Sequence, residues 1–215
     1  MSYKSAQRLI MADHHTLFSE ACKKMLEPEF ETIAIVPDGR TLVETALELK
    51  PNAAILEVAL PRLNGLDAAE QLSRKLPSTK LVFLTTNADP AVAAEAFRRG
   101  TSGYVPKHAG AEEFLMALRR VLRGESYLSP LVARETVTYL LRGPEPARKR
   151  KDITGRQAEI LQLLAEGRSM NEAAHILNIS PGTVAFHKYE MMDKLGITSN
   201  AGLLLYAMKR LPIAV

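Results

Sequence analysis

The sequence predicts an α/β fold in two parts. Residues 1–125 read as a (βα)5 doubly wound parallel sheet, and residues 150–215 read as an all-α helix-turn-helix domain, joined by a connector helix and linker at 126–149. Two observations predict this organisation. Short apolar runs alternate with helical apolar patterns in the first part, and closely spaced helix-capping signals fill the second. With 215 residues, 47% of them apolar, the chain is long enough to bury a core in each part.

The first part contains five apolar runs of strand length, each followed by a helical pattern. Strand and helix alternating at this spacing imply right-handed crossovers and a parallel sheet covered on both faces. The helices are indicated by apolar residues three or four positions apart, beginning at Leu17, Leu42, Leu66, Val92 and Phe114. The expected strands are 9–12, 32–36, 53–56, 80–85 and 103–105.

Polar side chains follow the carboxyl ends of four of these strands. Asp13 and His14 follow the first strand and Glu57 follows the third. Thr85 ends the fourth strand and Lys107 lies just past the fifth. Ligands of open parallel sheets bind at this edge, so we expect the five side chains to converge on one rim.

Two adjacent histidines, His14 and His15, lie at this rim. Neighbouring residues of an extended segment point in opposite directions, so we expect them not to share a metal ion and predict no metal site. A pH-sensing role for His14 against Asp13 and Glu57 is chemically feasible. Acid-base catalysis by Asp13 and Glu57 is disfavoured, because no nucleophile or glycine-rich phosphate loop accompanies them. We therefore expect no enzyme activity and no cofactor.

The connector contains an amphipathic stretch at 131–141, followed by the Gly-Pro-Glu-Pro sequence of 143–146, whose prolines cannot continue a helix. The domain boundary is expected near there. The Arg-Lys-Arg-Lys run at 148–151 follows. Such a run is either a solvated linker or, beside a DNA-reading module, a phosphate contact.

Three helix starts follow in close succession. Thr154 with Gln157 and Ser169 with Glu172 are capping boxes, and Ser180 precedes a proline at the first position of a third helix. Two short helices joined by a few residues, the second strongly capped, form a helix-turn-helix. The residues of the third helix expected to face inward are Val184, Met191 and Leu195.

The net charge of +4 lies entirely in the second part. Residues 1–125 hold 16 Lys and Arg against 16 Asp and Glu, whereas residues 126–215 hold 12 against 8. This asymmetry favours a polyanionic partner for the second part, although ordinary surface composition also produces a charge of this size.

Composition favours a cytoplasmic protein that does not contact membranes. No apolar run approaches the roughly 18 residues of a membrane span, and the first one, at 9–12, is too short for a signal peptide. Cys22 is the single cysteine, which excludes an internal disulfide and fits a reducing compartment.

The rim segments occur in a characteristic order. They are Ala-Asp-His-His at 12–15, the run 51–57, Leu-Pro-Arg-Leu-Asn-Gly at 60–65, Thr-Thr at 85–86 and Gly-Tyr-Val-Pro-Lys at 103–107. In these segments residues 7–125 resemble the receiver domain of two-component response regulators. The resemblance implies that Thr85 and Tyr104 form a switch pair that moves on activation. The alternative is that Tyr104 is a half-buried aromatic residue on an edge strand.

Two departures from that family concern its chemistry. The family carries two adjacent acids that hold Mg²⁺ and an aspartate that accepts a phosphoryl group, whereas this chain has His14 and Glu57 at two of these positions. An imidazole is a poor ligand for Mg²⁺. The extra methylene of Glu57 displaces the carboxylate by roughly 1 Å, which can cost about 100-fold in rate. We therefore predict a degenerate receiver that works without phosphorylation.

Three roles for Glu57 remain open on the sequence. Its carboxylate can stand where a phosphoryl oxygen would lie and pair with Lys107. It can be inert, with the rim serving as a docking surface for a protein partner. It can also belong to a structural ion pair in which Lys107 or a protonated His14 satisfies a buried Glu57 or Asp13.

Residues 150–210 resemble the C-terminal DNA-binding domain of NarL/FixJ-type, LuxR-like regulators. The match rests on 153–157, 163–167, 173–174, 179–184, His187, 194–196 and the last helix at 201–209. The resemblance implies a recognition helix at 181–194 in the major groove of double-stranded DNA. Phosphate contacts are expected from Thr183, His187, Lys188 and Lys194, and base contacts from Ala185, Phe186 and Tyr189.

The expected recognition helix also departs from its family, which often has Lys or Arg where this chain has Gly182 and Ala185. Glu190 adds a negative charge to the same helix. The leading interpretation is a dimeric transcription regulator that pairs through an apolar face at 200–208. The alternative is a protein-interaction adaptor with weak or no DNA binding.

Overall fold

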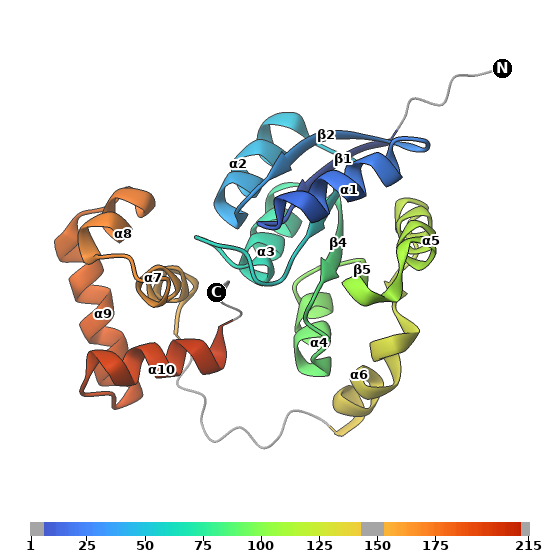
Figure 1. Ribbon diagram of the computed structural model, residues 1–215. Helices are drawn as coiled ribbons and strands as arrows, with labels where there is room; N and C mark the ends of the chain where they lie inside the picture. Colours follow the sequence, from blue (N-terminus) through green and yellow to red (C-terminus); the bar gives the residue numbers. More distant parts are fainter. Residues whose placement is uncertain (1–6, 143–152, 212–215) are drawn as a thin grey trace.

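A six-stranded sheet, parallel throughout, forms the centre of the first part of the chain in the computed structural model (Figure 1). The structure describes residues 7–142 and 153–211, so the proline-rich segment at 143–146 and the basic run at 148–151 lie outside the described residues. The strand order is β2-β1-β3-β4-β5-β6. The strands are β1 (Gln7–Ala12), β2 (Phe30–Val36), β3 (Ala53–Leu56), β4 (Lys80–Thr85), β5 (Gly103–Pro106) and β6 (Tyr127–Leu128).

Helices cover both faces of the sheet, as the alternating pattern predicts. On one face Leu26 and Phe114 are buried with the side chains of β1, and on the other Leu42 and Leu72 are buried with Phe83. The helices of the first face are α1 (Thr16–Leu26) and α5 (Ala111–Leu122), and those of the second are α2 (Gly39–Leu49), α3 (Gly65–Lys75) and α4 (Pro90–Arg98). A short 3-10 turn, η1 (Lys107–Ala109), follows β5.

A sixth strand extends the expected five-stranded sheet. β6 pairs in parallel with β5 and is only two residues long, too short to produce a periodic pattern. Helix α6 (Pro130–Arg142) follows it and packs against α4, with Val132 3% exposed. The beginning of the expected connector is thus packed on the sheet, and β5 is an internal strand.

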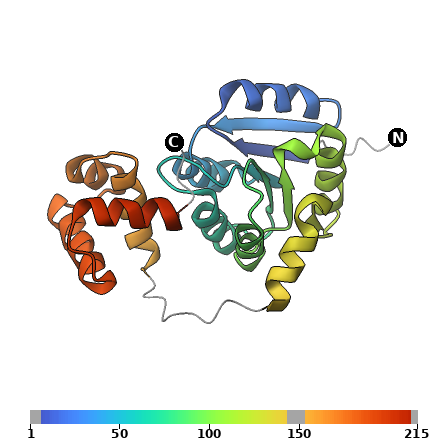
Figure 2. The ribbon, with the colours of Figure 1, turned by 60° about the horizontal axis from the view of Figure 1, so that its bottom comes forward.

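In residues 153–211, four helices surround a core of their own, which includes Ile160, Leu163, Val184 and Leu203. Both expected capping boxes are present, at Thr154 and at Ser169, and Ser180 caps the helix that begins at Pro181. The helices are α7 (Gly155–Ala165), α8 (Met170–Leu177), α9 (Pro181–Leu195) and α10 (Asn200–Arg210) (Figures 1 and 2). Among the described residues, no helix is both long and apolar enough to span a bilayer.

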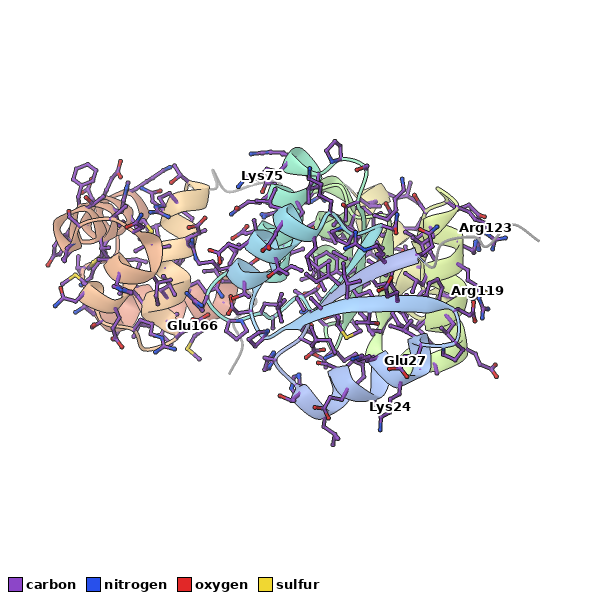
Figure 3. All side chains as sticks on the ribbon, turned by 90° about the horizontal axis from the view of Figure 1, so that it is seen from above. Lys24, Glu27, Lys75, Arg119, Arg123 and Glu166 are labelled. Carbon is purple, nitrogen blue, oxygen red and sulfur yellow. The ribbon has the colours of Figure 1, made fainter. Side chains whose placement is uncertain are left out.

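Helix α7 joins the two parts by binding the loop between β3 and α3. Gln162 is fully buried; its Nε2 donates to the carbonyl of Leu60 (2.8 Å) and its Oε1 accepts from the backbone N–H of Asn64 (2.8 Å). The carboxylate of Glu166 accepts from the backbone N–H of Arg62 (3.0 Å), and Figure 3 labels Glu166 where the two parts meet. These bonds satisfy backbone groups of the loop, so the interface is specific rather than a loose contact.

A second, charged contact lies beside the first. Arg40 of α2 lies 3.1 Å from the carboxylate of Glu159, which also accepts from Gln71 of α3 (3.3 Å). Arg156 pairs with the same carboxylate within α7 (2.9 Å). Glu159 therefore links α7 to two helices of the sheet domain.

Candidate functional site

The ends of four strands bring Asp13, Glu57, Thr85 and Lys107 together, as the sequence predicts. The register pairs Ala12 with Leu56, so the residues that follow β1 and β3 lie side by side. Thr85 is the last residue of β4, and Lys107 follows directly after β5. Parallel strands thus deliver all four side chains to the same edge of the sheet.

Glu57 is 1% exposed, and hydrogen bonds engage both oxygens of its carboxylate. Oε1 accepts from the backbone N–H of Val58 (2.7 Å) and from the hydroxyl of Thr85. Oε2 accepts from the backbone N–H of Thr86 (3.1 Å) and lies 2.9 Å from Lys107 Nζ. A buried carboxylate with four partners is held in one orientation.

Close packing behind Glu57 supports this position. A Cβ atom on Gly65, the first residue of α3, would lie 2.1 Å from the carbonyl oxygen of Glu57. Glycine therefore allows α3 to begin directly against the backbone of Glu57.

Lys107 joins the two acids of the rim. Its Nζ lies 2.5 Å from Asp13 Oδ2 and 2.9 Å from Glu57 Oε2, and its side chain is 11% exposed. The ammonium group also lies 4.3 Å from the centre of the Phe18 ring. Asp13, Glu57 and Lys107 together carry a formal charge of −1, so the cation offsets one of the two buried negative charges.

The donor set of the rim does not suit Mg²⁺. That ion requires a nearly octahedral shell of hard oxygen ligands. Here Lys107 occupies one oxygen of each carboxylate, and His14 offers nitrogen in place of a second adjacent acid. No chemistry of the rim is therefore assigned to Mg²⁺.

The two histidines differ from expectation. His15, not His14, contacts Asp13: its Nδ1 and its backbone N–H each lie 2.9 Å from Asp13 Oδ1. The ring centres of His14 and His15 lie only 4.0 Å apart. The expectation that adjacent histidines point apart is wrong, because residues 13–15 form a bend between β1 and α1 rather than a strand.

His14 is partly buried, and its Nδ1 has no hydrogen-bond partner among the described residues. Burial lowers the pKa of His14, and the neighbouring His15 lowers it further, against the opposing effect of Asp13. The imidazole of His14 is consequently biased toward its neutral form.

Thr85 and Tyr104 lie on neighbouring strands and meet the same segment. Asn87 donates its backbone N–H to the Thr85 hydroxyl (3.1 Å), and its carbonyl accepts from the Tyr104 hydroxyl (2.8 Å). Tyr104 is fully buried on internal strand β5, so its alternative placement as a half-buried residue on an edge strand is wrong. Burial raises the pKa of Tyr104, and the charge of Glu57 adds to this effect.

Helix α9 presents an aromatic face to solvent. Phe186 and Tyr189 are 63% and 60% exposed, whereas Val184 and Met191 are fully buried against the other helices. Lys188 Nζ lies 5.2 Å from the centre of the Tyr189 ring. Ala185 is partly exposed beside these side chains, and Lys194 is exposed in the last turn.

Other polar residues of α9 serve the structure of the helical domain. The Thr183 hydroxyl lies 2.9 Å from that of the capping residue Ser180. His187 Nδ1 lies 3.6 Å from the carboxylate of Glu190, too far for a hydrogen bond. That carboxylate accepts a hydrogen bond from Gln157 Nε2 of α7 (2.9 Å). Glu190 thus anchors α9 to α7, a role that its charge alone did not indicate.

An exposed apolar face runs along α10. Leu204, Leu205 and Met208 are 38%, 58% and 65% exposed. These residues lie in the segment 200–208, which is expected to form the interface of a homodimer.

Comparisons with known proteins match both parts of the chain. A family profile of the response regulator receiver domain matches residues 9–119, and one of bacterial regulatory proteins of the luxR family matches residues 151–207. The chain is similar to the response regulator GacA of Pseudomonas aeruginosa, with 28% identity over 205 residues that cover 94% of this chain and 95% of GacA. It is 29% identical to the oxygen regulatory protein NreC of Staphylococcus aureus over 211 residues, covering 94% and 97% of the two chains.

Solved structures of RcsB share the fold. The RcsB response regulator of Salmonella typhimurium has a TM-score of 0.63 at 24% identity, covering 96% of this chain and 98% of that chain. RcsB from Salmonella enterica serovar Typhimurium bound to the promoter P1flhDC has a TM-score of 0.59 at 25% identity, covering 94% and 98%.

Proposed function

This chain belongs to the response regulators that join a receiver domain to a regulatory domain of the luxR family, and from that premise we propose that it is a transcriptional regulator that binds double-stranded DNA through α9. The observation that carries the proposal is the exposure of Phe186 and Tyr189 beside Lys188 on a well-capped helix. Gln162 and Glu166 of α7 make hydrogen bonds to the first part, whereas Phe186 and Tyr189 of α9 remain exposed. The similar protein RcsB has been solved bound to promoter DNA.

The proposed DNA contacts divide by chemistry. Lys188 and Lys194 suit phosphate groups, and Ala185, Phe186 and Tyr189 suit base edges and thymine methyl groups. Thr183 and His187 are further phosphate candidates, although both already contact neighbours within the helical domain.

The test of DNA binding is the selection of genomic fragments by the full-length protein, followed by affinity measurements over a range of salt concentrations. Lys188→Gln removes one phosphate contact and should reduce the slope of log K against log salt by about 0.9. Lys75→Gln, in the last turn of α3, removes the same charge outside the helical domain and should leave the slope unchanged. If no fragment is enriched, the adaptor function replaces this proposal.

We further propose that the receiver acts without phosphorylation. Glu57 already engages Thr85 and Lys107, so the arrangement of the rim does not depend on an added phosphoryl group. Its carboxylate is enclosed by four hydrogen-bonding or ionic partners, which leaves no oxygen free to attack a phosphoryl donor.

Acetyl phosphate with Mg²⁺ tests this second proposal. The wild-type protein should form no phosphoryl adduct and should change neither its oligomeric state nor its DNA affinity. The double variant His14→Asp/Glu57→Asp restores the acids of the family and serves as the positive control. A phosphoryl adduct on wild-type protein would overturn the proposal.

Homodimerisation through α10 completes the proposed function. The support is the exposed apolar face of Leu204, Leu205 and Met208. A symmetric pair of recognition helices would match half-sites about one helical turn apart. Leu205→Glu should abolish a dimer in sedimentation experiments, whereas Leu131→Glu, at a similarly exposed leucine on α6, should not.

The adaptor remains a second candidate function. Gly182 and Ala185 leave the first turns of α9 without the cations common in its family, and Glu190 adds a carboxylate. In that case the rim of the receiver would dock a protein partner.

A further inference from the structure

The bend between β1 and α1 gathers three side chains that ligate metals. One ligand atom from each of Asp13, His14 and His15 lies within 4.8 Å of the other two. The first residue is buried, the second is partly buried and the third is exposed, so the cluster opens to solvent on the side of His15.

One atom of this cluster lacks the partner that its burial requires. His14 Nδ1 is inaccessible to solvent and has no hydrogen-bond partner among the described residues. Leaving such a nitrogen unpaired is unfavourable, because burial removes the hydrogen bonds that water would supply. A cation bound to Nδ1 of His14 would supply the missing partner.

We propose that Asp13, His14 and His15 bind a divalent transition-metal ion of the zinc class. Two imidazole nitrogens and one carboxylate oxygen are a common zinc donor set, with water completing a tetrahedral shell. The set differs from the all-oxygen shell that Mg²⁺ requires, so this site is distinct in chemistry from the magnesium site of the family.

The distances are compatible with closure around an ion. Zinc binds His nitrogen at about 2.0–2.1 Å, which places tetrahedral ligand atoms roughly 3.3 Å apart. The three ligand atoms, now within 4.8 Å of one another, must therefore move closer together. The side chain of His15 is 53% exposed and has room to turn toward the other two. Lys107 holds Asp13 through Oδ2, which leaves Oδ1 to face the histidines.

The surrounding charge also favours a cation. Asp13 and Glu57 carry two negative charges against the single positive charge of Lys107. Lys107 pairs with both Asp13 and Glu57. A metal ion bound to Asp13 would therefore influence both of these ion pairs at the rim.

The experiment is a calorimetric titration of the full-length protein with ZnCl₂, repeated with MgCl₂, together with the visible absorption spectrum of the Co²⁺-loaded protein. We expect one zinc ion per chain, bound far more tightly than Mg²⁺, and a Co²⁺ spectrum of tetrahedral type. His14→Gln and His15→Gln should each weaken zinc binding by roughly tenfold or more.

The control variant is His175→Gln, which removes an exposed histidine of α8 in the other part of the chain and should leave zinc affinity unchanged. Thermal unfolding checks that each variant is folded. Because the side chain of His15 is exposed, His15→Gln is expected to disturb the fold less than His14→Gln does. The proposal is overturned if zinc does not bind, or if His14→Gln and His15→Gln bind it as wild type does. DNA binding is measured separately, so either proposal can fail without the other.

Discussion

At the scale of the residue, Glu57 sets the character of the receiver rim. A carboxylate one methylene longer than aspartate reaches Thr85 and Lys107 while remaining almost fully buried. Removing a charge from such a group leaves its partners short of an acceptor in a region that water does not reach. Breaking the ion pair between Glu57 and Lys107 is therefore expected to destabilise the fold, whatever the role of the pair in signalling.

Glu57→Gln should lower the free energy of unfolding by about 3 kcal/mol, because Lys107 and two backbone N–H groups lose a charged acceptor. Urea unfolding measures this change. Glu125→Gln breaks a solvent-exposed pair with Arg120 and should cost less than about 1 kcal/mol. Equal losses of unfolding free energy in the two variants would show that the buried network stabilises the fold no more than an exposed ion pair does.

The single cysteine allows a second test. Burial raises the pKa of the Cys22 thiol to about 11 from an ordinary value of 9.0, and the charge of Asp13 adds to this effect. The thiolate fraction at neutral pH is then about 100-fold lower than for a free thiol. Alkylation of the folded protein by iodoacetamide should be slow, should accelerate as pH rises toward 11, and should become fast in urea. Mass spectrometry at fixed times gives the rates, and rapid alkylation of folded protein at neutral pH would contradict the prediction.

At the scale of the element, α9 combines strong local signals with an unusual surface. Ser180 and the proline that follows it determine where the helix begins, and Glu190 ties its middle to Gln157 of α7. Its outward face is aromatic rather than rich in arginine. Affinity for DNA is therefore expected to depend on few cationic side chains, and adding one more should change it measurably.

Ala185→Arg should strengthen DNA binding and steepen its salt dependence by about 0.9 log units per log of salt, because the side chain lies on the open face of α9. Fluorescence anisotropy with a fixed DNA fragment measures both quantities. Ala111→Arg adds the same charge at an exposed position of α5 and should leave the slope unchanged. An unchanged slope in Ala185→Arg would mean that α9 does not face the DNA.

At the scale of the whole molecule, α7 connects the helical domain to the loop that begins at Glu57. Gln162 and Glu166 bind the backbone of residues 60, 62 and 64, within a few residues of the buried carboxylate. Arg62 adopts a left-handed φ of 64° in this loop, which is uncommon for a residue other than glycine. The position of this loop is thus shared by the rim and by the interface between the two parts.

Gln162→Ala should loosen the association of the two parts. Its loss leaves a carbonyl of residue 60 and an N–H of residue 64 unpaired, at a cost of about 2 kcal/mol, or roughly 30-fold in the ratio of associated to separated forms. Small-angle X-ray scattering should report a larger radius of gyration. Gln157→Ala, also buried in α7 but bonded within its own domain, should destabilise that domain without enlarging the molecule. An unchanged radius in Gln162→Ala would contradict the prediction.

Most of the fold could be predicted from the sequence because its signals are local. Apolar periodicity identified five strands and their helices, and the capping boxes at Thr154 and Ser169 identified the starts of α7 and α8. The convergence of Asp13, Glu57, Thr85 and Lys107 followed from the rule that parallel strands end at one edge. The two-residue strand β6 escaped prediction because a pattern of two residues has no period.

The sequence by itself determined which side chains lie at the rim and on α9, since strand and helix periods assign each residue to a face. Only the tertiary structure decided that Gln162 is buried against a distant loop, that His15 rather than His14 contacts Asp13, and that Tyr104 is enclosed. These three features depend on contacts between residues far apart in the chain or on the path of a bend. Such contacts and bends produce no periodic pattern in the sequence from which they could be predicted.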